Sequence, residues 1–188
     1  MIRISNREIA LLGILSEGPL YGYKLNKIIE EQGMRYWTDI GFSSIYYALK
    51  RLEDAKLLQS RLEAVEGKPS RRVYTITTTG KKVVKEKVKS LLSNYERQIY
   101  SFDLGIFNIP LLTLTDVVAE LRHYIKSINE RLDLLESLLS YRNQSGASYI
   151  MVSLFTRPMA HLRTEKAWVE QFIQEIEGKL GNNVNPST

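Results

Sequence analysis

The chain has 188 residues, of which 44% are hydrophobic, and a net charge of +5. This length fits one or two domains, each with a packed core. The sequence contains no cysteine, which excludes disulfides, thiolate nucleophiles and cysteine metal sites and fits a reducing compartment, so we expect a cytoplasmic protein. No run of about 18 apolar residues predicts a membrane span, and the N-terminal residues do not read as a signal peptide.

The positive charge is concentrated in the first half of the chain. Residues 1–98 contain 18 basic and 11 acidic residues, a net charge of +7, whereas residues 99–188 contain 8 and 10, a net charge of −2. A basic half joined to a slightly acidic half suggests that the first half meets a polyanion. A chance imbalance is the alternative, and charge alone does not decide between the two.

Helical spacing of apolar residues predicts two helices before residue 33. Ser5 or Asn6 can cap the first helix, and Gly18-Pro19 ends it. The second helix lies within "LYGYKLNKIIEEQG", where Gly33 is well placed to stop it. An aromatic connector, "MRYWTDIGF", follows.

The stretch "FSSIYYALKRLEDAKLLQS" predicts a third helix with two different faces. Ile45, Leu49 and Leu52 have the spacing of a buried stripe. The opposite face carries a hydroxyl, a phenol and charged groups, with one more cation beside it: Ser43, Tyr47, Lys50, Asp54 and Arg51. This composition suggests a helix that is anchored on one side and binds something on the other.

After residue 59 the pattern changes from helix to strand. "SRLEAV" and "RRVYTITT" are rich in β-branched and aromatic residues, and "EGKPS" between them is a turn, so we expect a hairpin. We expect Tyr74 and Ile76 to face inward and Val73 to face outward. The tip of the hairpin is basic because it carries Lys68, Arg71 and Arg72.

A helix capped by a threonine of "TTTG" is predicted next, with an apolar stripe of five residues: Val84, Val88, Leu91, Tyr95 and Ile99. The segment "SFDLGIFNIPLL" breaks the helical rhythm, and we place the domain boundary there. The predicted domains are residues 1–100 and 101–180, followed by a disordered tail over residues 181–188.

The second domain is predicted to consist of two long helices. The first covers about residues 115–141 and has near-heptad apolar spacing. The second covers about residues 147–176, where Pro158 should bend or divide it and Trp168, Phe172 and Ile176 should form a buried stripe.

The predicted order of elements indicates a mostly α (α+β) fold. Three helices followed by a hairpin are the parts of a winged helix-turn-helix, and the remaining helices form a C-terminal α-helical dimerisation domain. The major groove of B-DNA is about 12 Å wide and admits one α-helix. The predicted contacts with double-stranded DNA come from the third helix and the hairpin: Ser43, Ser44, Tyr46, Tyr47, Lys50, Arg51, Lys68, Arg71 and Arg72.

Three segments carry a resemblance to a known family. "ALLGILSEGPLYGYKLNKIIEE", "SSIYYALKRLEDAKLLQS" and "GKPSRRVYTITTTGKK" resemble the PadR family of transcription regulators over residues 8–92. Residues 105–178 resemble the virulence-activator-like helical domain of its longer members. Tyr47 stands where the family usually has proline, which leaves the third helix uninterrupted.

The resemblance implies a homodimeric repressor that binds a pseudo-palindromic operator and that a small aromatic or hydrophobic ligand releases. Candidate ligand-binding residues are Trp37, Tyr100, Phe107 and Trp168. A buried tryptophan is, however, more often part of a hydrophobic core than part of a ligand site. A ligand-independent activator and a protein-interaction adaptor remain alternatives. The sequence has no phosphate loop, nucleophile elbow or metal-ligand spacing, so we expect no enzyme, no metal site and no cofactor.

Overall fold

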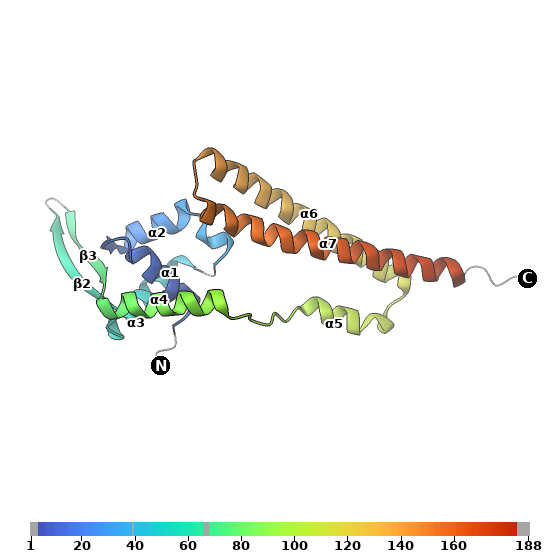
Figure 1. The fold of residues 1–188 in the computed structure, drawn as a ribbon, viewed down its shortest axis with the longest axis horizontal. Coiled ribbons are helices and arrows are strands. Elements are labelled where there is room, and N and C mark those ends of the chain that lie inside the picture. The colour runs from blue at the N-terminus through green and yellow to red at the C-terminus, as the bar shows by residue number, and fades with distance from the viewer. Residues whose placement is uncertain (1–3, 39, 66–67, 184–188) are drawn as a thin grey trace, which may run out of the picture. The chain divides into compact units, whose positions relative to one another are not determined.

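The computed structural model describes residues 4–38, 40–65 and 68–183. The chain forms two compact units, residues 1–97 and 98–188, and each unit has its own hydrophobic clusters (Figure 1). The fold is mostly helical with a small antiparallel sheet, as the sequence predicts. Within the described ranges, no helix is long and apolar enough to cross a bilayer.

The first unit contains the predicted helices and hairpin together with two short elements. The α-helices are α1 (Asn6–Leu15), α2 (Gly22–Glu31), α3 (Phe42–Asp54) and α4 (Thr78–Ser93). The strands are β1 (Leu20–Tyr21), β2 (Leu58–Val65) and β3 (Lys68–Ile76), and a 3-10 turn, η1, covers Met34–Tyr36. The sequence did not predict β1 or η1, because two or three residues are too few to show a periodicity.

The core of the first unit lies between α1, α2, α3 and the sheet. The predicted stripe of α3 is confirmed, since Ile45, Leu49 and Leu52 are all buried. α2 ends as expected at Gly33, whose φ of 61° lies in the left-handed region that glycine adopts without strain. Burying one face of α3 leaves its other face to solvent.

The sheet has the order β1-β3-β2, so β3 is the central strand. Tyr74 and Ile76 are buried, as predicted, but Val73 is buried too. In the antiparallel register Val73 lies opposite Tyr21 on one side and Arg61 on the other. Cross-strand neighbours share a face of the sheet, so these two long side chains cover the valine that was expected to face outward.

Helix α4 is shorter than its apolar pattern suggests. Thr77 caps it, and the backbone leaves the helical conformation after Ser93. Val84 is buried, but Val88 and Leu91 are about half exposed, and Tyr95 and Ile99 lie beyond the helix, largely exposed. The prediction of a five-residue stripe on this helix is therefore wrong, because its last two members lie beyond the end of the helix.

The second unit contains α5 (Ser101–Phe107), the 3-10 turn η2 (Ile109–Leu111), α6 (Leu114–Gln144) and α7 (Tyr149–Asn183). The segment that was expected to be irregular thus contains a short helix. Pro158 lies within α7, which the structure describes as one helix and not as two. The helix also continues through Asn183, three residues into the expected tail, and residues 184–188 lie outside the described part of the chain.

Helices α6 and α7 pack against each other and bury apolar residues in two clusters. Leu121, Leu132 and Leu135 of the predicted α6 stripe are buried there. On α7 the buried positions near the C-terminus are Val169, Ile173 and Ile176. Trp168 is 45% exposed, so the prediction that it is buried is wrong: it lies one residue beside the face that meets α6.

Candidate nucleic-acid interface

The outer face of α3, formed by Tyr46, Tyr47 and Lys50, is the most prominent candidate surface in the first unit. Tyr47 is 72% exposed and Tyr46 48% exposed. Lys50 is also exposed, and no ion pair among the described side chains engages it. A cation and two phenols therefore project from a helix whose opposite side is fixed in the core.

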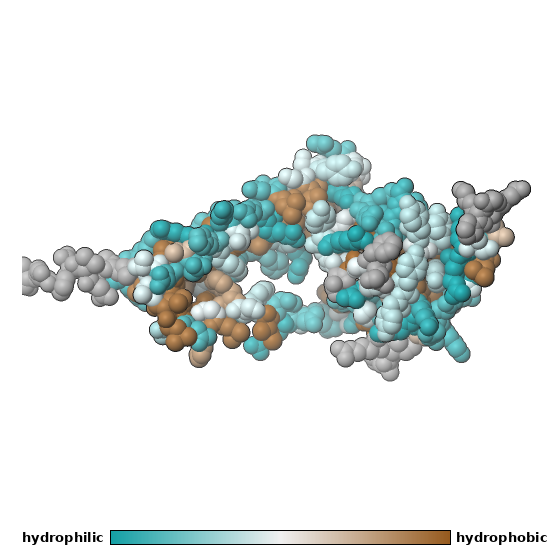
Figure 2. Space-filling view, turned by 180° about the vertical axis from the view of Figure 1, so that it is seen from behind, coloured by the Kyte–Doolittle hydropathy of each residue, from teal (hydrophilic) through white to brown (hydrophobic). Residues whose placement is uncertain are grey.

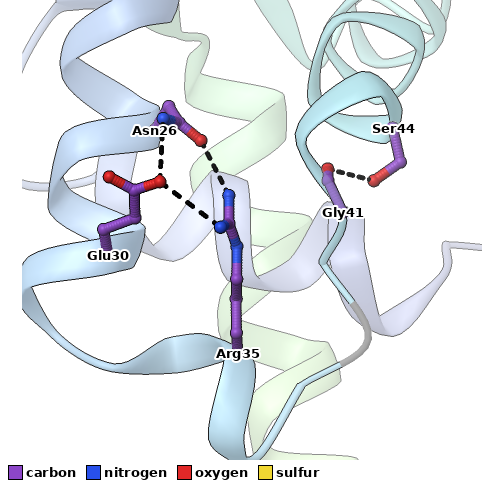
Figure 3. Close-up of polar contacts among 5 residues, drawn as sticks. All are labelled: Asn26, Glu30, Arg35, Gly41 and Ser44. Carbon is purple, nitrogen blue, oxygen red and sulfur yellow. Dashed lines mark hydrogen bonds and ion pairs between the residues drawn. The ribbon is translucent and has the colours of Figure 1, made fainter.

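A polar cluster holds the turn that leads into α3. Arg35 of η1 donates a hydrogen bond of 3.0 Å to the side-chain oxygen of Asn26 and lies 3.3 Å from the Glu30 carboxylate (Figure 3). Asn26 is buried and donates to the same carboxylate at 3.4 Å. Charge-assisted hydrogen bonds of this kind are stronger than neutral ones, so the connection between α2 and α3 is pinned at α2.

Contacts within the protein already engage part of the α3 surface that is predicted to enter the DNA groove. The Ser44 hydroxyl donates to the Gly41 carbonyl at 2.7 Å, at the start of α3 (Figure 3). The ring of Tyr46 lies against Gly22, because an added Cβ at that glycine would come within 2.7 Å of the ring. The backbone of Ser43 is part of α3, but its side chain lies outside the described residues.

Arg51 has a different environment from the neighbouring Lys50. Its Nε lies 2.8 Å from the carboxylate of Glu8, a side chain that is only 4% exposed. The same carboxylate accepts hydrogen bonds from the Ser5 backbone N–H at 2.7 Å and from the Ser5 hydroxyl at 2.8 Å. The pair thus ties α3 to the N-terminus of α1.

The sequence analysis did not single out Glu8. The motif Ser5-x-x-Glu8 is the sequence pattern of a capping box, and the structure contains the complete box. That signal predicts the hydrogen bonds to Ser5. The ion pair with Arg51 has no counterpart in the local sequence, because the two residues are 43 positions apart.

The hairpin carries the second group of predicted DNA contacts. Arg71 lies 3.4 Å from Glu63 and stacks over the ring of Tyr21 at 4.7 Å, while Arg72 lies 3.6 Å from Glu53. Lys68 begins β3, but its side chain lies outside the described residues. Exposed ion pairs of this kind contribute about 0–1 kcal/mol, so phosphate can replace the carboxylate partners at little cost.

Arg61 of β2 is a cation that the sequence analysis did not name. It is 73% exposed and donates to Glu63 at 2.9 Å. The hydrogen bond from Arg61 is the main reason that the pKa of Glu63 lies below its ordinary value, and Arg71 adds to the effect. Three arginines therefore gather along the hairpin: Arg61, Arg71 and Arg72.

Of the four candidate ligand residues, Trp37 belongs to the first unit and the other three belong to the second. Trp37 lines a broad depression of about 1270 Å³ in the first unit, beside Tyr47 and Arg51. Tyr100, Phe107 and Trp168 belong to the second unit. Tyr100 and Phe107 are largely exposed, whereas Trp168 stacks on Phe172 with a centroid distance of 5.1 Å.

Comparison with known proteins identifies the architecture of the first unit. Residues 11–86 match the model of the Transcriptional regulator PadR-like family. The chain is thus similar to the PadR-like family over this segment. Members of that family are transcription regulators.

A curated relative and several solved structures are similar to the PadR-like chain. The "Negative transcriptional regulator PadR" of Bacillus subtilis (strain 168) is 33% identical over 74 residues, which cover 39% of this chain and 40% of that protein. The alignment thus spans less than half of the curated relative. The crystal structure of Bacillus subtilis PadR in complex with operator DNA has a TM-score of 0.71 at 21% identity and covers 90% of this chain and 98% of that one.

Two further structures share the fold. Bacillus subtilis PadR in complex with p-coumaric acid has a TM-score of 0.71 at 20% identity, with coverage of 90% and 98% of the two chains. The Vibrio cholerae virulence activator AphA has a TM-score of 0.70 at 13% identity, with coverage of 93% and 99%. Because these matches cover most of the chain, the PadR-like chain has the fold of these regulators in its helical second unit as well.

Proposed function

We propose that this chain represses transcription in the cytoplasm as a homodimer that binds a pseudo-palindromic operator in double-stranded DNA. The observation that carries the proposal is the outer face of α3, which is exposed and cationic and stands beside a hairpin with three arginines. The anchored face of α3 and the pinned turn before it keep this surface in a fixed orientation. Operator binding by the Bacillus subtilis relative agrees with the proposal.

The two parts of the surface have different tasks in this proposal. An α-helix fits the major groove, where Lys50 can donate to guanine and the phenols can contact thymine methyl groups or the backbone. The hairpin arginines neutralise phosphates, which positions the domain but carries little sequence information. Arg51 contributes mainly by holding α3 in place, since its guanidinium is already paired with Glu8.

A homodimer explains the apolar side chains that a single protomer leaves exposed. Leu92, Tyr95, Ile99, Phe107 and Leu111 are each at least 80% exposed. Soluble proteins rarely leave so many large apolar side chains in water without a partner. A C2 pair is the commonest way to cover them, and it would present two α3 helices to half-sites about 34–36 Å apart.

Repression and release by a small aromatic ligand are the finer part of the proposal. The curated Bacillus subtilis relative is named a negative regulator, and a structure of that protein contains p-coumaric acid. Both properties come to this chain only by similarity. Activation would require the same DNA surface and would differ only in where the operator lies relative to the promoter.

The test is binding of the full chain to duplex DNA from its own upstream region, followed by fluorescence anisotropy at 50–200 mM salt. Affinity should fall steeply with salt, with a slope of about −0.9 for each phosphate that is neutralised. Replacing Lys50 with alanine should weaken binding, whereas Lys126→Ala on α6, an equally exposed lysine of the second unit, should not. An affinity that stays flat across the salt series would contradict the proposal.

A further inference from the structure

A small cavity of about 260 Å³, open to solvent on one side, lies within the second unit, between α5, η2 and the N-terminal half of α6. Most of its wall is apolar, and the principal lining residues are Phe102, Ile106, Ile109, Val117, Leu121 and Tyr124. Figure 2 shows hydrophobic side chains gathered over the α5 segment around it. None of the four ligand residues suggested by the sequence lines this cavity.

Two stacked rings, Phe102 and Tyr124, form the base of the cavity, and Trp168 packs against Phe102 outside the lining. The rings of Phe102 and Tyr124 stack with a centroid distance of 4.4 Å, and Trp168 meets Phe102 edge-on at 6.3 Å. Aromatic pairs in these geometries contribute about 0.5–1.5 kcal/mol beyond their burial. The base is thus made of rings that hold one another in place, so the cavity keeps its shape when α5 is in position.

The volume of the cavity limits what can enter it. An apolar cavity of about 150 Å³ in an engineered protein stays dry and binds benzene, whereas drug-sized ligands need about 300–1,000 Å³. At about 260 Å³ this cavity has room for one six-membered ring with one or two small substituents.

The charges around the cavity decide which rings it accepts. Glu120 lines the cavity, and the Tyr124 hydroxyl donates to Glu165 at 3.3 Å. Burial raises the pKa of Tyr124, and the nearby Glu165 carboxylate adds to the effect. The phenol therefore stays neutral, and its proton is already used in the hydrogen bond to Glu165. No cation is among the described lining residues, and His123, which lies 3.7 Å from the Glu120 carboxylate, is largely exposed. A carboxylate in the cavity would therefore lose part of its hydration beside a like charge, without a cation among the described lining residues to offset the loss.

We propose that this cavity binds an uncharged single-ring aromatic molecule and discriminates against aromatic carboxylates. The site would thus take a different class of ligand from p-coumaric acid, the carboxylic acid found in the Bacillus subtilis structure. Binding by the cavity stands independently of DNA; only an effector role for the ligand rests on the proposed function.

The experiment is isothermal titration calorimetry of the full chain with two probes of equal ring size, p-cresol and 4-methylbenzoate. p-Cresol should bind, and 4-methylbenzoate should bind at least tenfold more weakly. Equal affinity for the two probes, or no binding of p-cresol, would overturn the proposal. Because DNA is absent, failure here leaves the proposed function intact, and the salt series described above tests that function separately.

Matched variants locate the site. Ile106→Trp puts a larger side chain into the cavity and should abolish p-cresol binding, whereas Leu134→Trp, at an exposed position of α6 outside the lining, should preserve it. Circular dichroism establishes that both variants fold. Binding that survives in Ile106→Trp, or that both variants lose equally, would place the ligand elsewhere and overturn the proposal.

A charge reversal tests the selectivity without filling the cavity. Glu120→Lys should raise the affinity for 4-methylbenzoate relative to p-cresol by about fivefold, a modest effect because this side chain is 72% exposed. Glu130→Lys makes the same charge change at a similarly exposed position of α6, away from the cavity, and should leave the ratio unchanged. An equal change of the ratio in both variants would show that net charge, and not this cavity, sets the preference.

Discussion

Arg51 and Lys50 are neighbours on α3 with different environments. The guanidinium of Arg51 lies 2.8 Å from the buried carboxylate of Glu8, whereas Lys50 extends into solvent. Removing the partner of a buried carboxylate leaves that charge desolvated, which is where most of the cost of such a substitution arises. The structure therefore gives the two cations separate roles, anchoring for Arg51 and DNA contact for Lys50.

We expect Arg51→Ala to lower the free energy of unfolding by about 1–2 kcal/mol, because Glu8 keeps its hydrogen bonds to Ser5 but loses its counter-charge. Lys50→Ala should change it by less than about 0.5 kcal/mol, as expected for an exposed side chain. Urea unfolding followed by circular dichroism measures both. An Arg51→Ala protein of unchanged stability that nevertheless loses DNA affinity would show that Arg51 is a direct contact instead.

Tyr124 should make the stability of the second unit depend on pH in the alkaline range. Because the folded state raises the pKa of this phenol above its ordinary value near 10, the folded chain holds the proton more tightly than the unfolded chain. The contribution of Tyr124 to stability should therefore be fully present below about pH 10 and be lost as the pH rises further. Thermal unfolding of wild type and Tyr124→Phe between pH 8 and 11 measures the effect, and the variant should show the flatter profile. Parallel profiles would contradict this role of Tyr124.

At the scale of elements, the hairpin β2–β3 combines a defined register with exchangeable surface charges. Its register brings Glu63 opposite Arg71 and places Arg61 opposite Val73. Two half-buried carboxylates, Glu53 and Glu63, pair with these arginines when DNA is absent. This arrangement predicts that DNA phosphates bind by replacing the carboxylates as partners of the arginines, and not by entering a preformed pocket.

Replacing both Arg71 and Arg72 with alanine should weaken binding to all duplexes by a similar factor and reduce the salt slope by about 2. Phosphate contacts carry little sequence information, so the ratio of operator to random-duplex affinity should change little. Arg163→Ala, which breaks an exposed pair with Glu136 in the second unit, is the control. Loss of affinity for the operator alone would instead assign base contacts to the hairpin.

At the scale of the whole molecule, each unit has a core of its own, and ten of the 21 large apolar side chains that are exposed in the described residues lie between Val88 and Leu112. The heptad-like stripe of α6 is no argument for a dimer by itself, because α7 of the same chain covers much of it. The dimer proposal instead depends on the exposed residues near the junction of the units and on the fold shared with known regulators.

A chain that ends after Arg97 should fold, since the first unit keeps its complete core, but it should be monomeric and bind the operator more weakly. Analytical ultracentrifugation of the full chain and the truncated chain at micromolar concentration measures the difference. A truncated protein that remains a tight dimer would refute the assignment of the main dimer contacts to residues 98–188.

The sequence by itself determined the helices, the hairpin and the burial of Ile45, Leu49 and Leu52, because caps, turns and apolar periodicity act over a few residues. It also carried the Ser5-x-x-Glu8 capping box. Only the tertiary structure decided the pairing of Glu8 with Arg51, the covering of Val73 by its cross-strand neighbours, the exposure of Trp168 and the cavity beneath α5. These features join residues far apart in the chain, and no local pattern specifies which distant side chains will meet.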